Sequence, residues 1–351
     1  MENKNLIVIL ISIIFLLLIL ILTMYNDIHS SNILSNNSSN SSSKILINNT
    51  SKSSEKVLII SNSSVIDKFG IKEIYNSQAG GRQWYSKWDN YHKRSWDDSS
   101  NDPDDEEFFT KYKGDGDWNT DGDGILKISG EYPRMYVIDR DRVKSWHNVE
   151  ITVYGMRISD DNVRYAGIVS VARTNHLIDD NGCDTRGYSG RFTLDGRTDF
   201  EKEIDHHADN GYAQTATKHY WSGGMPKNVW IGYKFIVYDL TTADNSNILP
   251  ENSNMLPNVR LELWMDTTDG LNGGKWILVD EFIDTGKNFG KEGSGCRPNI
   301  DPYAILNKSD TRIGSESGKP NLAVYFRSDE VDDNGLWYKK ASIREIITER
   351  N

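Results

Sequence analysis

The sequence predicts an all-β fold, a two-sheet antiparallel sandwich, for most of this 351-residue chain. Short segments rich in β-branched and aromatic residues recur from residue 124 to residue 346, and turns of Gly, Asp, Asn and Pro separate them. No long segment between them shows the 3.6-residue apolar period of an amphipathic helix. The segments amount to about twelve strands, whose apolar faces need a facing layer to cover them. We therefore expect two sheets packed face to face.

Each predicted strand is bounded by turn residues. Residues 148–158 carry apolar side chains on both faces, which indicates a central strand that touches both core and cleft. The full set covers residues 124–130, 134–139, 148–158, 165–173, 189–196, 198–205, 216–221, 228–240, 259–266, 275–283, 322–329 and 337–346.

An apolar segment from Leu6 to Tyr25 precedes the strands. About twenty helical residues span roughly 30 Å, which matches the hydrocarbon thickness of a bilayer. No shorter apolar stretch followed by a small-residue cleavage site is evident, so the sequence predicts an uncleaved membrane anchor over residues 1–28. Lys4 favours a cytoplasmic N-terminus, which places the C-terminal domain outside the cell. Cleavage of this segment would instead give a secreted protein.

Residues 29–70 are rich in Ser and Asn and contain too little apolar surface to offset chain entropy, so we expect a disordered stalk. Residues 71–351 then form the sandwich. The sequence offers N-glycosylation motifs, although a biased genome composition would also supply Asn and Ser without glycosylation. These motifs are at Asn36, Asn37, Asn40, Asn48, Asn49 and Asn62, with one more at Asn307.

Cys183 and Cys296 are the two cysteines of the chain, and both lie in Gly-rich loops. In an exported protein such a pair favours a disulfide, which would stabilise the fold by roughly 4 to 5 kcal/mol in the chain-entropy model. The alternative is two unpaired thiols. The net charge of −11, without a basic stripe, argues against a nucleic-acid partner.

Residues 191–207 contain the pattern that decides function. A turn at Asp195 and Gly196 predicts a hairpin, and the second strand places Phe200 and Ile204 on one face. Because strand side chains alternate, the other face receives four ionisable groups, which are Glu201, Glu203, Asp205 and His207. Such a strand is either a solvated surface or the floor of a polar cleft.

Two further segments offer binding candidates. Residues 80–96 concentrate aromatic residues that include Trp84, which predicts core packing or a platform on which a sugar ring stacks, in a helix or a strand. Residues 114–124 resemble the start of a calcium loop in their oxygen ligands, although an Asp-rich β-turn explains the same letters. The calcium candidates are Asp117, Asn119, Asp121 and Asp123.

Three places resemble concanavalin-type sandwiches, the superfamily of legume lectins, laminarinases and alginate-lyase-like enzymes. They are the E-I-D of residues 203–205, the strand pair 261–286 and the closing segment 322–346. The resemblance extends to exported one-domain sandwiches of unestablished function and covers most of residues 71–346. It implies a jelly roll that acts on carbohydrate and needs no cofactor, apart from the calcium considered above.

The β-glucan hydrolases of this superfamily carry E-I-D-x-E or E-I-D-x-x-E, with nucleophile, electrostatic partner and general acid in that order. Glu203 and Asp205 match the first two positions, while His207 or Ala208 stands at the third. Glu203 and His207 lie about 13 Å apart along a strand, whereas retaining hydrolysis needs two carboxyls about 5 to 5.5 Å apart. The resemblance therefore disfavours an ordinary hydrolase.

The resemblance to polysaccharide lyases implies different roles, because β-elimination from a uronate needs a carboxylate clamp, a base and an acid. Arg173 or Arg191 would be the clamp and His206 or His207 the base. The late-strand acid and its neighbour would be Tyr325 and Arg327. Glu203 completes the catalytic candidates, and the substrate contacts add Asp205, Tyr220 and Trp84. The Q-I-H triplet of these lyases is replaced here by E-I-D-H-H.

Structural readings compete with these roles. His176, His206, His207 and His219 would be hydrogen-bonded surface residues or, three together, a metal site. Arg191 or Arg327 would simply pair with Glu203 or Asp329, and Tyr325 would belong to the core. We expect first a carbohydrate-binding module at the cell surface. The alternative is a polysaccharide lyase, the most favoured of the possible enzymes, and the third reading is a structural or adhesive domain.

Overall fold

The structure is a computed structural model, and it describes residues 65–98, 100–109, 116–138, 145–159, 166–176, 185–204, 212–240, 258–290, 301–307 and 322–348. The chain divides into two units, Met1–Ile59 and Ile60–Asn351, and all described residues belong to the second. The predicted anchor (1–28), the stalk as far as residue 64 and both cysteines lie outside the described residues. Within the described part, no helix is long and apolar enough to cross a membrane.

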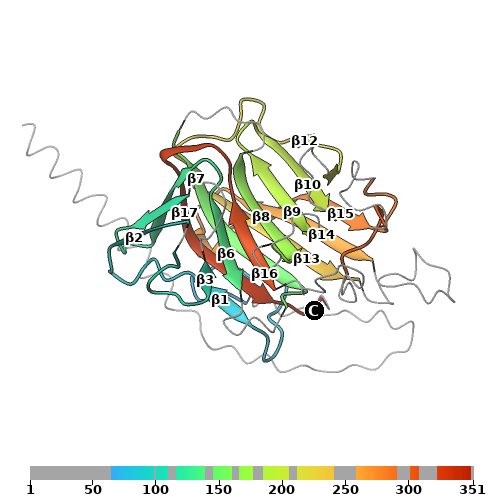
Figure 1. Cartoon of the computed structure of the whole chain (residues 1–351), viewed down its shortest axis with the longest axis horizontal. Helices are drawn as coiled ribbons and strands as arrows, with labels where there is room; N and C mark the ends of the chain where they lie inside the picture. Colours follow the sequence, from blue (N-terminus) through green and yellow to red (C-terminus); the bar gives the residue numbers. More distant parts are fainter. Residues whose placement is uncertain are drawn as a thin grey trace, which may run out of the picture. The chain divides into compact units, whose positions relative to one another are not determined.

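One of two antiparallel sheets has nine strands, eight of which form a continuous path (Figure 1). Their order is β15 (Ile277–Asp284), β14 (Val259–Asp266), β13 (Ile231–Asp239), β7 (Val149–Arg157), β17 (Val331–Glu345), β5 (Ile125–Gly130), β4 (Asp117–Thr120) and β2 (Arg94–Asp97). The ninth strand, β1 (Gln83–Tyr85), pairs with β17.

The other sheet has eight strands. Its order is β11 (Ala213–Gln214), β10 (Arg197–Glu203), β9 (Gly187–Thr193), β8 (Gly167–Thr174), β16 (Ala323–Arg327), β6 (Arg134–Ile138) and β3 (Phe108–Phe109), with β12 (Lys218–His219) beside β10. Among the described residues, helical structure is confined to the 3-10 turn η2 (Leu271–Gly273). The prediction of an all-β fold with two antiparallel sheets is confirmed. Residues 80–96, for which helix or strand was open, contribute β1 and β2.

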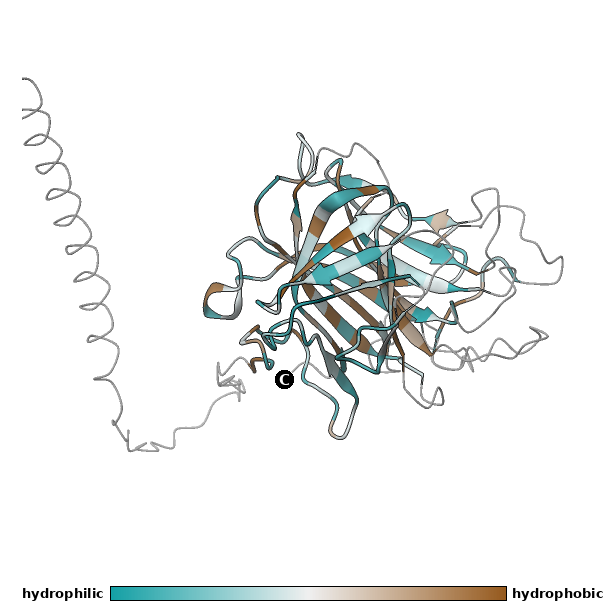
Figure 2. Ribbon diagram, turned by 60° about the vertical axis from the view of Figure 1, so that its left-hand side comes forward, coloured by the Kyte–Doolittle hydropathy of each residue, from teal (hydrophilic) through white to brown (hydrophobic). Residues whose placement is uncertain are grey.

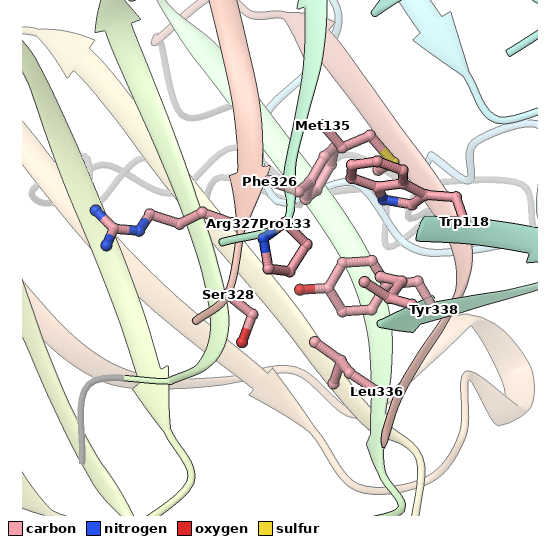
Figure 3. A pocket seen from close by; sticks show the side chains of 9 residues that line it. Trp118, Pro133, Met135, Phe326, Arg327, Ser328, Leu336 and Tyr338 are labelled. Carbon is pink, nitrogen blue, oxygen red and sulfur yellow. The ribbon is translucent and has the colours of Figure 1, made fainter. Parts of the chain in front are cut away.

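The apolar core lies between the two sheets, and hydropathy alternates along the strands accordingly (Figure 2). At one end a cavity of only about 10 Å³ is lined by apolar side chains that include Trp118, Met135 and Phe326. Figure 3 shows that Arg327 extends away from this cavity, whereas Phe326 points into it. The cavity is too small for a sugar ring, so it is a packing defect of the core and no binding site.

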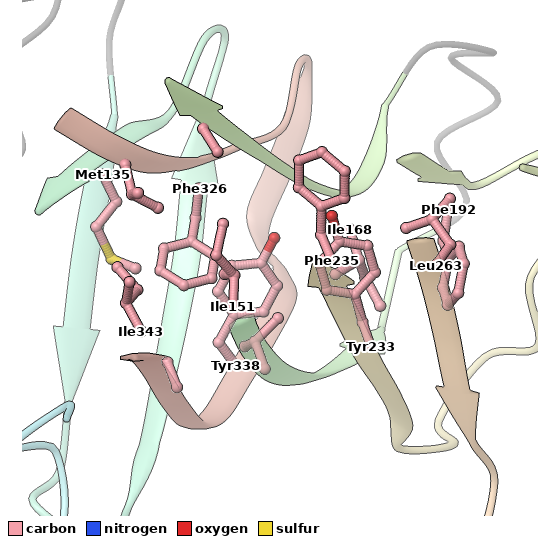
Figure 4. Packing of buried hydrophobic residues seen from close by; sticks show 14 of the residues in the cluster. Met135, Ile151, Ile168, Phe192, Tyr233, Phe235, Leu263, Phe326, Tyr338 and Ile343 are labelled. Carbon is pink, nitrogen blue, oxygen red and sulfur yellow. The ribbon is translucent and has the colours of Figure 1, made fainter. Parts of the chain in front are cut away.

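Toward the middle of the sandwich, large side chains of the two sheets interdigitate (Figure 4). Phe235 of β13 packs against Phe200 of β10, with ring centroids 6.1 Å apart. Gly190 of β9 lies beneath Phe235, because a Cβ at this position would meet Phe235 Cδ2 at 2.5 Å. The two sheets therefore approach closely where β9 and β10 cross β13.

The outer face of the nine-stranded sheet is covered by the first described residues of the chain. Glu150 of β7 accepts hydrogen bonds from the backbone nitrogens of Ile74 and Tyr75, each at 3.1 Å. The Tyr75 hydroxyl donates to Glu262 of β14 at 2.9 Å. Arg344 of β17 pairs with Glu150 at 2.9 Å. This buried network covers the outer face of β7 around Glu150.

Candidate functional site

The outer face of the eight-stranded sheet carries the acidic residues of β10. Phe200 points into the core, so Asp199, Glu201 and Glu203 point outward. The predicted alternation and hairpin are confirmed as far as Ile204, which is buried. Residues 205–207, which hold the candidates Asp205, His206 and His207, lie outside the described residues.

Strand register brings β16 residues onto the same face. Arg327 is the neighbour of Val169 on β8, Val169 of Arg191 on β9, and Arg191 of Asp199 on β10. A parallel row runs from Tyr325 through Val171 and Ser189 to Glu201. The structure thus places four sequence-predicted candidates on one face, although up to 136 positions separate them along the chain. These are Arg191, Glu203, Tyr325 and Arg327.

We call this set of outward groups the polar face, with Val169, Val171 and Ser189 as small side chains between the larger ones. Its charged and aromatic members are Arg134, Tyr136, His176, Arg191, Arg197, Asp199, Glu201, Glu203, Tyr325 and Arg327, together with the carboxylates of Asp195 and Asp329 that pair with them.

The arginines of the polar face are held by carboxylates. Arg191 Nε donates to Asp199 Oδ1 at 2.6 Å, and its Nη1 pairs with Glu201. Arg327 and Arg134 share Asp329, at 3.0 Å from Arg327 Nη2 to Oδ2 and 2.6 Å from Arg134 Nη2 to Oδ1. The sequence had left pairing of Arg327 with Asp329 open, and it is present.

Arg197, at the start of β10, is also paired with a carboxylate, and its Nε lies 2.7 Å from Asp195 Oδ2. Asp199 Oδ2 also accepts hydrogen bonds from Gln214 Nε2 at 2.6 Å and Thr217 Oγ1 at 3.2 Å. Planar side-chain groups in fixed orientations therefore extend from β9 to the edge strand β11. Sequence reasoning missed Asp199 and Gln214, because only cross-strand register brings them to Arg191.

The pKa values of two carboxylates of the polar face are shifted in opposite directions. Burial raises the pKa of Glu201 above its usual 4.5, although Arg191 and Arg327 oppose the shift. Burial acts in the same sense on Asp329, but there Arg327 and Arg134 outweigh it and hold the pKa below 3.8. Asp329 is thus a permanent anion that fixes two guanidinium groups, whereas Glu201 takes up a proton more readily.

His176, which follows β8, lies at the polar face. Its Nε2 lies 2.7 Å from Glu203 Oε2, and its ring lies 5.5 Å from that of Tyr325. Burial raises the pKa of Tyr325, so the phenol stays protonated and can donate but not abstract a proton at neutral pH. Tyr136 packs on the other side of Tyr325, with ring centroids 4.7 Å apart.

Tyr220 lies at the edge of the eight-stranded sheet. Its backbone nitrogen donates to Gly196 at 2.8 Å, so it lies beside the β9–β10 turn. The ring is 43% exposed and rests edge-on against Trp221 at 5.1 Å between centroids. His219, on β12, is also exposed. Tyr220 is therefore an accessible aromatic at the border of the polar face.

Arg173 and Trp84 are not on the polar face. Arg173 has φ 54°, at a register irregularity between β8 and β16, and its Nη1 donates to Asp239 at 2.6 Å. It therefore ties β8 to β13 of the other sheet. Trp84 is 3% exposed, and its Nε1 donates to Asp105 Oδ2 at 2.7 Å. A ring so buried offers no face to a sugar.

The calcium candidates form the β4–β5 hairpin. Asp117 and Asn119 lie on β4, and Asp123 Oδ1 accepts a hydrogen bond from Ile125 N at 3.1 Å. Asp121 pairs with Lys127 and Lys93, each at 2.9 Å, and these two cations hold its pKa at about 2. In the described ranges, no group of three or more His, Cys, Asp or Glu side chains is arranged to hold a metal. Asp121 and Asp123 thus have partners within the protein.

A scan of protein-family models finds no family that matches this sequence, and a search of curated proteins finds no matching relative.

Proposed function

We propose that the polar face binds a polysaccharide. The observation that carries this proposal is the pair of accessible groups Glu201 and Gln214, which the buried Arg191 and Asp199 hold in fixed orientations. The exposed ring of Tyr220 borders them. Sugar hydroxyls are recognised by planar groups that both donate and accept, and pyranose C–H faces stack on aromatic rings. Carboxylate and guanidinium groups locked by one another meet a ligand at little cost in side-chain entropy.

The remaining sequence predictions belong to this proposal. We propose a jelly roll of the concanavalin type, which the two packed antiparallel sheets support. The domain would lie outside the cell, tethered by residues 1–28 through the stalk and closed by a Cys183–Cys296 disulfide. Glycans would be attached in the stalk, because Asn307 in the body is only 1% exposed.

A second candidate function, polysaccharide cleavage by β-elimination, is favoured by one observation. His176, hydrogen-bonded to Glu203, lies next to the protonated phenol of Tyr325. A histidine base and a tyrosine acid are the two proton-transfer groups that the reaction needs. In this case His176 takes the role that the resemblance to polysaccharide lyases implies for His206 or His207.

The test uses the full chain, oxidised and solubilised in detergent, incubated with insoluble and immobilised polysaccharides. Depletion of protein onto the polymer measures binding, and ultraviolet absorbance of unsaturated ends measures β-elimination. We expect binding that Gln214→Ala together with Tyr220→Ala, both at exposed positions, reduces at least tenfold. Asp121→Asn, which removes one charge from the β4–β5 turn, is the matched control and should bind like the wild type. Equal binding by all three proteins, or by none, would refute the proposal.

A further inference from the structure

We infer that the polysaccharide recognised by the polar face is neutral, and that the carboxylates of this face exclude uronate polymers. The inference rests on the proposed binding function and names the substrate class. It also decides between the two candidate functions, because β-elimination requires a carboxylate next to the carbon that loses its proton, and a neutral polysaccharide has none.

The arginines are the groups on which a uronate would depend. Each of them is already engaged, Arg191 by Asp199 and Glu201, and both Arg134 and Arg327 by Asp329. Arg197 is engaged by Asp195. A uronate carboxylate would either displace one of these anions, several of which are buried, or take a remaining guanidinium N–H group and lie beside the anion already held there. Removing a partner from a buried pair costs far more than a new exposed pair returns.

The charge balance of the polar face also disfavours a uronate ligand. Among the described residues, five carboxylates (Asp195, Asp199, Glu201, Glu203 and Asp329) meet four guanidinium groups (Arg134, Arg191, Arg197 and Arg327). The surplus anion lies on β10, where Glu201 and Glu203 are outward neighbours. Lys218 of β12 does not neutralise this anion, because it forms an ion pair with Asp280 of the other sheet.

The hydroxyl groups of a neutral sugar can bind to this face without displacing its ion pairs. A neutral sugar accepts from guanidinium N–H groups and donates to carboxylate oxygens without separating the pairs, since each carboxylate has several lone-pair positions. A uronate held about 5 Å from the surplus carboxylate is repelled, which weakens binding roughly fourfold at the dielectric of bulk water and more than about a hundredfold at the dielectric of about 20 near a protein surface. A loss of about tenfold lies between these limits.

The experiment compares matched polymers with the full chain in detergent. Barley β-glucan and konjac glucomannan are immobilised as such and after selective oxidation of their C6 hydroxyls to carboxylates, so each pair shares one backbone. We expect the neutral member of at least one pair to bind about tenfold more tightly. Glu201→Gln, which keeps shape and removes charge, should shrink this ratio to about threefold or less, and Asp121→Asn should leave it unchanged.

A salt series on the wild type gives a test that needs no variant. The ratio should fall as salt is raised to about 1 M, where the Debye length is roughly 3 Å. Tighter binding of the oxidised members would overturn the inference and leave polysaccharide binding standing. A ratio that neither Glu201→Gln nor salt alters would also overturn it. Retention on none of the polymers, neutral or oxidised, would overturn both proposals together.

Discussion

Arg134 and Arg327 are adjacent on neighbouring strands and share the single carboxylate of Asp329. This anion offsets the repulsion between the two like charges. Arg134 Nη2 donates to its Oδ1, and Arg327 Nη2 donates to both of its oxygens. The polar face thus depends on a residue outside both strands, at the β16–β17 turn.

Asp329→Asn should therefore destabilise the fold by about 3 to 5 kcal/mol at pH 7, because it leaves two guanidinium groups without their anion. The pKa of Asp329 is depressed in the folded state, so its contribution is present above the unfolded value of 3.8 and is lost as pH falls through the folded value. Urea unfolding at pH 7 and at steps below pH 4 measures both effects. A variant whose stability falls below pH 4 as steeply as that of the wild type would contradict the assignment.

Gly190→Ala tests the close approach of the two sheets. The added Cβ would meet ring atoms of Phe235 and a methyl group of Leu263, so we expect a loss of about 1 to 3 kcal/mol. Gly223→Ala is the matched control, because a Cβ there would meet nothing within 4 Å. Thermal unfolding of both variants measures the difference. If the two melt alike, the packing of β9 against β13 is looser than the structure indicates.

His176→Ala should lower the stability of the fold. Glu203 would lose the ring nitrogen at 2.7 Å, and a carboxylate that loses a partner costs about 1 to 3 kcal/mol. His219→Ala, at an exposed position on β12, should change stability by less than about 0.5 kcal/mol. Chemical denaturation of the two single variants and of the double variant shows whether the effects add. Equal losses for both would mean that His176 is an ordinary surface residue.

Most of the fold followed from the period of the sequence, whereas the composition of the polar face followed only in part. Alternation along residues 198–204 assigned Phe200, Glu201 and Glu203 to their faces, because a half-buried strand must repeat every two residues. Lys202 contradicts that simple pattern, since it faces inward and is buried 3.0 Å from Asp284 of β15. The burial of Lys202 is explained only by its partner on the facing sheet, which the sequence of β10 does not reveal.

Partners that come from distant strands were beyond the sequence. Nothing near His176 signals its contact with Glu203, which depends on how β8 and β10 end. Trp84 and Arg173 were predicted to bind substrate and do not lie on the polar face. Trp84 makes a hydrogen bond in the core, and Arg173 makes an ion pair between the two sheets, because the same residue types suit these structural roles. Residue type limits what a side chain can do, and register decides which neighbour it meets.

The exclusion of uronate polymers should relax in mild acid. Burial raises the pKa of Glu201 above 4.5, and the charged groups that face it are Arg191, Arg327, Asp199 and Glu203. Sugar carboxylates have lower pKa values and stay ionised as Glu201 takes up its proton, so repulsion falls while the ligand keeps its charge. Binding of C6-oxidised glucan, relative to glucan, should therefore rise as pH falls from 7.5 toward the raised pKa of Glu201. The Glu201→Gln variant, which has no proton to gain there, should show a flat ratio. A wild-type ratio that is equally flat would assign the exclusion to another carboxylate of the face.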